Sequence, residues 1–329
     1  MKFFILYISA TVFYANAWIE RKMLSSFRAA KLATTTTGST GQRQERYAPL
    51  IMTTDAEDID LLAVAPVPKG RQRRQISLGM GKKGVVLSRT VQIASDWKIT
   101  VYEWEKPAAV VETYWQVEQQ GLTLTPSLSA SPAPLLDPFG LVCWPGSVVA
   151  AQEMKEYRSL FAGKRVLVLG AGVGIEAQAA AMLGAKRVIA TDIHPTTLRL
   201  LQYGAEQAGL SSTIKTKVLD LNSIEPLPEC DIMVAADVLY NERLALLVIR
   251  RILEAQQQND PPPMVLVTDS QRFVTDFDVI LSEKLEELGQ PAVEWVSRWL
   301  PTFTGSGVLV DADQTYDVKA RVLWVGRNY

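Results

Sequence analysis

Hydrophobic runs and amphipathic segments alternate through the second half of the chain. Five runs have the length and composition of buried strands: 165–169, 187–191, 214–218, 231–236 and 264–268. Apolar residues at helical spacing predict five helices: 146–160, 174–183, 195–208, 242–257 and 273–288. Strands that alternate with helices predict a parallel sheet with right-handed crossovers.

The segment 75–117 has a different pattern, with alternation and many β-branched and aromatic residues. It predicts a small antiparallel unit with strands at 85–87, 90–93, 97–104 and 110–115. The basic cluster Arg71-Gln72-Arg73-Arg74 lies in a Gly-rich stretch, and we expect it to be a solvated loop. Prolines in 123–138 predict a linker or a loop over a pocket, and 47–70 is expected to be poorly ordered.

A glycine loop follows the first predicted parallel strand. It reads Gly170-Ala171-Gly172-Val173-Gly174 and opens an alanine-rich helix, and the next strand ends on Asp192. Glycines let the backbone approach a ligand closely, and a carboxylate about twenty residues further on can accept hydrogen bonds from ribose hydroxyls. The pattern favours a nucleoside site over an ordinary strand-to-helix turn.

Two features select the cofactor. A dinucleotide site uses G-x-G-x-x-G/A, whereas Ile175 occupies the third small position in this chain. In addition, 293–300 and 319–325 are predicted strands with no helix between them, so we expect them to pair antiparallel. Five parallel strands closed by such a pair are typical of the Rossmann-like sheet of class I methyltransferases. The predicted cofactor is therefore S-adenosyl-L-methionine.

Composition narrows the chemistry. The 329 residues, 48% of them hydrophobic, are enough for one substantial core, and a net charge of −1 gives no sign of nucleic-acid binding. Cys143, Cys230 and the single histidine, His194, form no zinc-ligand pattern, so we predict no metal. Both cysteines are expected to be reduced, and His194 to lie at the rim of the cofactor pocket.

The N-terminal residues predict a targeting leader. Lys2 precedes an apolar run, 3–17, that is too short to span a bilayer and ends in Ala15-Asn16-Ala17, a cleavage signal. The basic, hydroxyl-rich segment 18–46 follows. This combination resembles the bipartite leader of nuclear-encoded plastid proteins in algae with secondary plastids. We expect a plastid location, with secretion or a mitochondrial location as alternatives, and no stable membrane association after leader removal.

Four motifs resemble a known family. They are Leu141-Val-Cys-Trp144-Pro145-Gly146, the Gly170 loop, Ala190-Thr-Asp192-Ile-His-Pro195 and Ala235-Ala-Asp237-Val-Leu-Tyr240-Asn-Glu242. Their order and spacing resemble the seven-β-strand protein-lysine methyltransferases of methyltransferase family 16, in particular the electron-transfer-flavoprotein β-subunit type. Asp137-Pro-Phe precedes the first motif, and Thr268-Asp269-Ser-Gln-Arg272 follows the fifth strand. Val168 is a departure, because the family commonly has an acid there that helps to hold the cofactor's amino group.

The resemblance implies roles for individual residues. Trp144 would border the cofactor, Asp192 would bind the ribose and Asp220 would lie near the adenine. Asp237 and Tyr240 would form the D-x-x-Y signature that faces the substrate and would serve as the catalytic pair. The implied cofactor-binding positions are Trp144, Gly170, Ala171, Gly172, Gly174, Asp192, Ile193, Asp220 and Ala236.

The residues themselves leave other interpretations open. Asp237 could cap the helix that starts near Glu242 or take part in a turn with Asn241. Tyr240 and Trp144 could serve packing alone, and Asp220 could be an exposed turn acid. Asp269 and Arg272 could contact the substrate or form a local ion pair.

These observations predict an α/β protein with a Rossmann-like seven-stranded class I methyltransferase sheet and a small N-terminal β-rich extension. The expected segments are a leader (1–46), the extension with its Pro-rich linker (47–136) and a methyltransferase domain (137–329). The predicted function is S-adenosylmethionine-dependent N-methylation of a protein lysine, with no nucleic-acid partner. The alternatives are a small-molecule methyltransferase and an inactive protein that only binds the cofactor.

Overall fold

The main sheet has seven strands in the order β6-β5-β4-β7-β8-β10-β9. Their bounds are β4 (Arg165–Leu169), β5 (Arg187–Asp192), β6 (Ile214–Val218), β7 (Ile232–Ala236), β8 (Met264–Asp269), β9 (Val296–Ser306) and β10 (Asp313–Val325). Strands β4 to β8 pair in parallel, whereas β10 is antiparallel to both β8 and β9. The predicted parallel sheet and its antiparallel C-terminal pair are confirmed.

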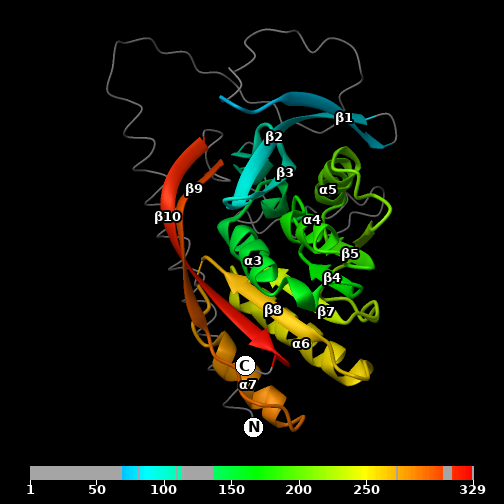
Figure 1. Cartoon of the computed structure of the whole chain (residues 1–329), viewed down its shortest axis with the longest axis vertical. Helices are drawn as coiled ribbons and strands as arrows, with labels where there is room; N and C mark the ends of the chain where they lie inside the picture. The colour runs from blue at the N-terminus through cyan, green and yellow to red at the C-terminus, as the bar shows by residue number, and fades with distance from the viewer. Residues whose placement is uncertain are drawn as a thin grey trace, which may run out of the picture. The chain divides into compact units, whose positions relative to one another are not determined.

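Helices cover both faces of this sheet (Figure 1). They are α3 (Pro145–Glu156), α4 (Ile175–Met182), α5 (Pro195–Gln207), α6 (Glu242–Gln258) and α7 (Phe277–Glu286), with short 3-10 turns at η1 (Phe139–Leu141) and η2 (Arg158–Leu160). In β4, Val166 and Val168 pack with α3, α4 and α5, while Leu167 and Leu169 pack with α6 and α7. Burial on both faces explains why the parallel strands are continuous hydrophobic runs.

Local signals set where the helices begin. Pro145 and Pro195 stand in the first turns of α3 and α5, where a missing N–H costs nothing. Asn241 caps α6, because its Oδ1 accepts a hydrogen bond from the Leu244 N–H at 2.8 Å. Helix α7 begins at Phe277 and not at the expected residue 273, because Arg321 of β10 donates to the Val274 carbonyl and ties the preceding segment to the sheet.

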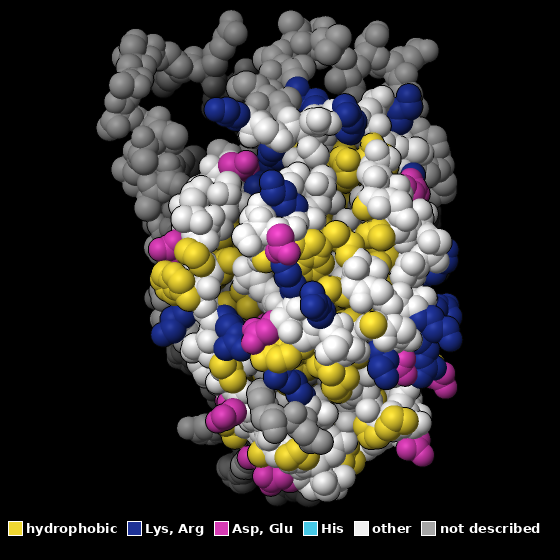
Figure 2. Space-filling model, viewed as in Figure 1, with side chains coloured by type: hydrophobic (Ala, Val, Ile, Leu, Met, Phe, Trp, Pro, Cys, Tyr) yellow, Lys and Arg dark blue, Asp and Glu magenta, His cyan; other side chains and the backbone are white. Residues whose placement is uncertain are grey.

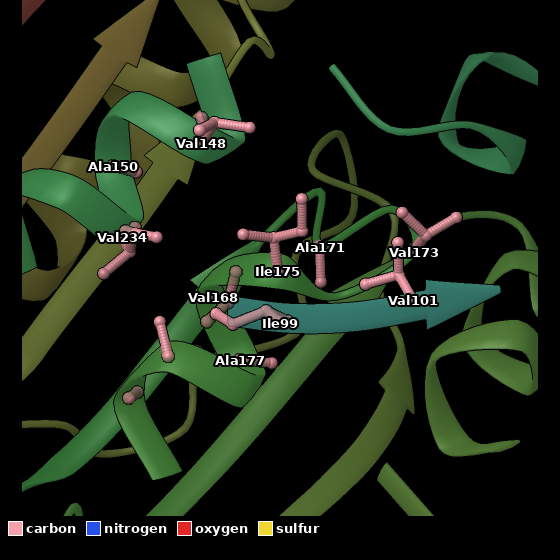
Figure 3. Packing of buried hydrophobic residues seen from close by; sticks show 14 of the residues in the cluster. Ile99, Val101, Val148, Ala150, Val168, Ala171, Val173, Ile175, Ala177 and Val234 are labelled. Atoms are coloured by element: carbon pink, nitrogen blue, oxygen red, sulfur yellow. The ribbon is translucent and has the colours of Figure 1, made fainter. Parts of the chain in front are cut away.

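A second sheet of three antiparallel strands precedes the main sheet: β1 (Arg73–Gly79), β2 (Lys82–Ala94) and β3 (Trp97–Trp104). The expected antiparallel unit is confirmed, although the strands predicted at 85–87 and 90–93 are one strand. This sheet packs on α3, α4 and α5. Ile99 and Val101 of β3 lie with Ala171 and Val173 of the glycine loop in one buried cluster (Figure 3).

The expected strand 110–115 is wrong. Residues 110–112 and 114 are helical. A helix places positions three apart on one side. Val111 therefore packs against Val142, and the Tyr114 ring lies 6.0 Å from the Phe139 ring. Contacts with the segment before α3 thus override the β propensity of this stretch.

The expectation of a solvated loop at Arg71 is also wrong. Arg71 and Arg89 share two carboxylates, Glu103 and Asp313, in what we call the Glu103 cluster. Only 6% of each arginine side chain is exposed, and Glu103 is fully buried. Acids from β3 and β10 compensate the buried guanidinium groups, and these partners are distant in sequence. Arg73 and Arg74 of the same basic cluster lie in β1.

The structure describes residues 69–79, 82–108, 110–112, 114, 136–271, 273–306 and 313–327, all within one unit, Pro66–Tyr329. The two sheets therefore belong to one unit, while the segment boundaries after 46 and 136 stay predictions. The leader 1–46, nearly all of 47–70, and 115–135, which includes most of the expected linker, lie outside the described residues. Both cysteines are free and buried, which confirms the expected reduced thiols.

The surface carries mixed charge. Figure 2 shows Lys and Arg side chains interspersed with acidic ones on the face in view. Within the described ranges, no helix is both long and apolar enough to cross a membrane.

Candidate active site

The glycine loop joins β4 to α4 in a conformation that requires glycine. Gly170, Gly172 and Gly174 have φ angles of 61°, 50° and 91°. A Cβ on Gly170 would lie 2.4 Å from Val238 Cγ1, and one on Gly174 would lie 2.4 Å from Leu201 Cγ. A Cβ on Gly172 would meet the Gly140 carbonyl oxygen at 3.5 Å, an ordinary contact, so the left-handed backbone alone selects glycine there.

Asp192 ends β5 beside this loop, as predicted. Its Oδ2 accepts a hydrogen bond from the Gly172 N–H at 3.1 Å, and its Oδ1 accepts one from the His194 N–H at 2.9 Å. Burial raises the pKa of Asp192 to about 6, and these backbone hydrogen bonds partly oppose the shift. Because a carboxylate can accept about four hydrogen bonds, capacity remains for ribose hydroxyls.

The segment ahead of α3 covers Asp192. A Cβ on Gly140 would lie 3.2 Å from Asp192 Oδ2, and the negative charge of Asp137 further raises the pKa of Asp192. The Tyr240 hydroxyl donates to Asp137, so Tyr240 and Asp192 both face this acid. Burial and then the Asp137 charge raise the pKa of Tyr240 well above its ordinary value, which keeps the hydroxyl protonated.

Phe139 organises an aromatic group around Asp137. Its ring centroid lies 5.4 Å from that of Tyr240, 6.0 Å from that of Tyr114 and 6.5 Å from that of Trp144, all edge to face. Trp144 Nε1 also donates to the Phe139 carbonyl at 2.7 Å. Asp137 and Phe139 were not among the predicted site residues. Their position just ahead of the Trp-Pro-Gly motif is the signal that could have identified them.

Asp237 follows β7 with a left-handed φ of 52° and is 7% exposed. Its Oδ2 accepts from the Gly146 N–H at 2.6 Å and from the Ser270 hydroxyl at 2.7 Å, and its Oδ1 accepts from the Ser270 N–H at 2.5 Å. Burial raises its pKa to about 6 against these hydrogen bonds. Asp237 therefore caps α3 from a distance and does not cap α6, where Asn241 is the cap.

The remaining predicted residues divide by position. Ala171 and Ala236 are buried, and Ile193, next to Asp192, is half-buried. Asp220 is exposed, and its carboxylate accepts from the Asn222 N–H at 2.8 Å, as a turn acid does. His194 caps α5, since Nδ1 accepts from the Thr196 N–H at 3.2 Å. Asp269 pairs with Arg321 of β10, which is distant in sequence. Arg272 lies outside the described residues, so the local ion pair of Asp269 with Arg272 stays a prediction.

Three elements therefore converge at the carboxyl ends of β4, β5 and β7: the glycine loop, the Asp137–Trp144 segment and the Asp237 turn. Ligands bind at this edge of open α/β sheets. The strand order, the left-handed glycines and the acid that ends β5 define a Rossmann-like class I methyltransferase fold.

Comparison with known proteins shows which family this part of the chain resembles. Residues 135–283 match the family described as lysine methyltransferase. Electron transfer flavoprotein beta subunit lysine methyltransferase of Mus musculus is 30% identical over 176 residues, which cover 48% of this chain and 64% of that protein. The resemblance to methyltransferase family 16 is thus confirmed over this segment. The chain spans less than two thirds of the length of this relative.

Two further proteins are similar to parts of this chain. Histone-arginine methyltransferase METTL23 of Xenopus laevis is 30% identical over 129 residues, which cover 36% of this chain and 54% of that protein. The solved structure of a SAM-dependent O-methyltransferase from Thermotoga maritima covers 57% of this chain and 68% of its own, with 15% identity and a TM-score of 0.38.

Proposed function

We propose that this chain is an S-adenosylmethionine-dependent N-methyltransferase that modifies lysine side chains of proteins. The observation that carries the proposal is the link between the glycine loop and Asp192, in which the Gly172 N–H donates to the carboxylate. This link supports the proposal, because a backbone cradle beside a carboxylate that would accept ribose hydroxyls is what a nucleoside requires. The relatives' names, a lysine and an arginine methyltransferase, support a protein substrate.

The charge of the site fits this cofactor. Asp192, Asp237 and Glu176 are buried carboxylates around the loop, and burial raises their pKa values to about 6, 6 and 7. Each also interacts with a neighbouring acid. Clustered acids suit a ligand with a sulfonium and an ammonium group, and they oppose the pyrophosphate of a dinucleotide.

When bound, S-adenosylmethionine supplies an activated methyl group, so that the amine nitrogen forms an N–C bond as the C–S bond breaks. The substrate ammonium must first lose its proton, and we propose that water accepts it. Asp137 and the ring faces of Phe139 and Tyr240 would attract and orient the lysine side chain. Asp237 already accepts three hydrogen bonds, so we assign it the positioning of α3 and of the loop after β8.

The test uses tritiated S-adenosylmethionine, the purified chain and a cell extract, followed by amino-acid analysis of labelled protein. Methyl-lysine in a protein band is the expected result. Label in methyl-arginine or only in small molecules would contradict the lysine proposal. Asp192→Ala is expected to abolish labelling. Asp231→Ala is the matched control, because Asp231 pairs with Arg165 at the opposite ends of the strands.

A plastid location is a separate proposal that rests on residues 1–46 alone. We propose that this leader directs a fluorescent reporter to the plastid in an alga with a secondary plastid. A reporter with only residues 1–17 is the matched control and is expected to be secreted. Secretion or mitochondrial import of the full leader fusion would overturn this proposal without affecting the proposed activity.

A further inference from the structure

Glu176 is a buried acid in the first turn of α4, two residues after the last glycine of the loop. It is 1% exposed, and its Oε2 atom is buried without a hydrogen-bond partner. The Ser147 hydroxyl of α3 hydrogen-bonds the carboxylate. No Lys or Arg in the described part of the chain forms an ion pair with it.

Such a group is costly if it serves only the fold. A buried carboxylate with an unsatisfied oxygen destabilises a core, and a neutral residue of similar size would avoid that cost. The N-terminus of α4 favours a negative charge but leaves Oε2 without a donor. The unsatisfied oxygen therefore indicates a ligand with an N–H donor and a positive charge.

Glu176 follows the glycine loop that begins just after Val168, the β4 position at which the family resemblance implies an acid. Val168 lies one residue before the end of β4 and packs in the same cluster as Ile175, the residue before Glu176 (Figure 3). Glu176 also interacts electrostatically with Asp237 and hydrogen-bonds Ser147 beside Gly146. It therefore lies where the glycine loop, the start of α3 and the Asp237 turn converge.

We propose that Glu176 binds the α-ammonium group in the amino-acid part of S-adenosylmethionine, in place of the acid that the family carries at position 168. This inference rests on the proposed function. The buried Oε2 would accept a hydrogen bond from the ammonium while Ser147 holds the other side of the carboxylate.

The test compares two ligands by calorimetry. S-adenosylhomocysteine carries the ammonium group, whereas 5′-methylthioadenosine lacks the amino-acid part. Glu176→Gln is expected to lower the affinity for S-adenosylhomocysteine by about tenfold to a hundredfold, because a hydrogen bond to a charged group is lost. The second ligand should keep its affinity within about twofold. Glu153→Gln is the matched control, because Glu153 is also buried with an unpartnered Oε2 but pairs with Arg298.

Three outcomes would overturn the inference. If Glu176→Gln binds S-adenosylhomocysteine as tightly as wild type, the ammonium contact is ruled out, but the proposed function is not affected. An equal loss of affinity for both ligands would show that Glu176 only supports the structure of the pocket. A wild-type chain that bound neither ligand would refute the proposed function itself.

Discussion

The Asp237 carboxylate caps α3 through the Gly146 N–H, at 2.6 Å, although 91 residues separate the two. Trp144 stands at the N-cap position of α3, and its side chain makes no cap hydrogen bond. The acid of the D-x-x-Y signature therefore holds the Trp-Pro-Gly motif in place. Two motifs that are distant in sequence form one structural unit at the edge of the site.

This contact predicts that a side chain at Gly146 would destabilise the fold. A Cβ on Gly146 would lie 2.4 Å from Asp237 Cγ, closer than real atoms approach. Gly146→Ala is expected to lower the free energy of unfolding by about 1–3 kcal/mol, as overpacking does. Urea unfolding would measure this loss. Gly204→Ala in α5 is the comparison, since its Cβ would meet the end of the Gln178 side chain at 3.1 Å and should cost less.

Tyr240 gives a test of the substrate side. Tyr240→Phe keeps the ring on Phe139 but removes the hydroxyl that donates to Asp137. We expect the rate of methyl transfer to fall about tenfold, with affinity for S-adenosylhomocysteine within about twofold of wild type. Tyr203→Phe on α5, whose ring packs on Tyr102, is the control and should change neither quantity. An unchanged rate in Tyr240→Phe would contradict the role of this hydroxyl.

Glu176 predicts a pH dependence of stability. Burial raises its folded-state pKa from 4.5 to about 7. The folded chain therefore binds more protons than the unfolded chain between these values, and its free energy of unfolding falls as pH rises through this window. The loss attributable to Glu176 is up to about 3 kcal/mol.

Glu176→Gln cannot titrate, so the part of this slope that comes from Glu176 should vanish. The variant is expected to be more stable than wild type at pH 8 and similar to it at pH 4, by urea unfolding. Equal pH slopes in the two proteins would show that Glu176 is not the titrating group. If Glu176→Gln is more stable than wild type but binds the cofactor more weakly, Glu176 serves cofactor binding at the expense of stability.

The Glu103 cluster predicts that replacing Glu103 destabilises the fold more than replacing the nearby Glu105. Glu103→Ala would leave Arg71 and Arg89 with less compensation and remove the acceptor of the Cys143 N–H, so we expect a loss of about 3–5 kcal/mol. Glu105→Ala breaks the more exposed pair with Arg73 and should cost about 1 kcal/mol or less. Chemical denaturation of both variants measures the difference, and equal losses would contradict the prediction.

Much of the fold could be predicted because its signals are local. The runs that became β4 to β8 are continuous and apolar, since both faces of the sheet are covered by helices. Prolines and Asn241 set the helix starts through the backbone geometry of the first turn. The strand expected at 110–115 was one exception, because β propensity there is weaker than the contacts of Val111 and Tyr114 with the segment before α3.

In the site, too, features with local signals could be predicted, whereas contacts between distant motifs could not. The left-handed glycines and Asp192 could be predicted because one strand-turn-helix unit with the following strand contains them all. The partners of Asp237 could not, since Gly146 and Ser270 come from other motifs. The same holds for the contact of Asp137 with Tyr240 and for the burial of Arg71.

The sequence by itself determined the order of the elements, the glycine loop and the acid that ends β5, because these depend on periodicity and on the backbone angles that glycine permits. Only the tertiary structure decided which carboxylates are buried and what each contacts. Burial and hydrogen bonding of a charge depend on groups brought together from different elements. For this reason Asp237 is a cap of α3, and Glu176, with one oxygen unsatisfied, becomes the candidate ligand-binding acid.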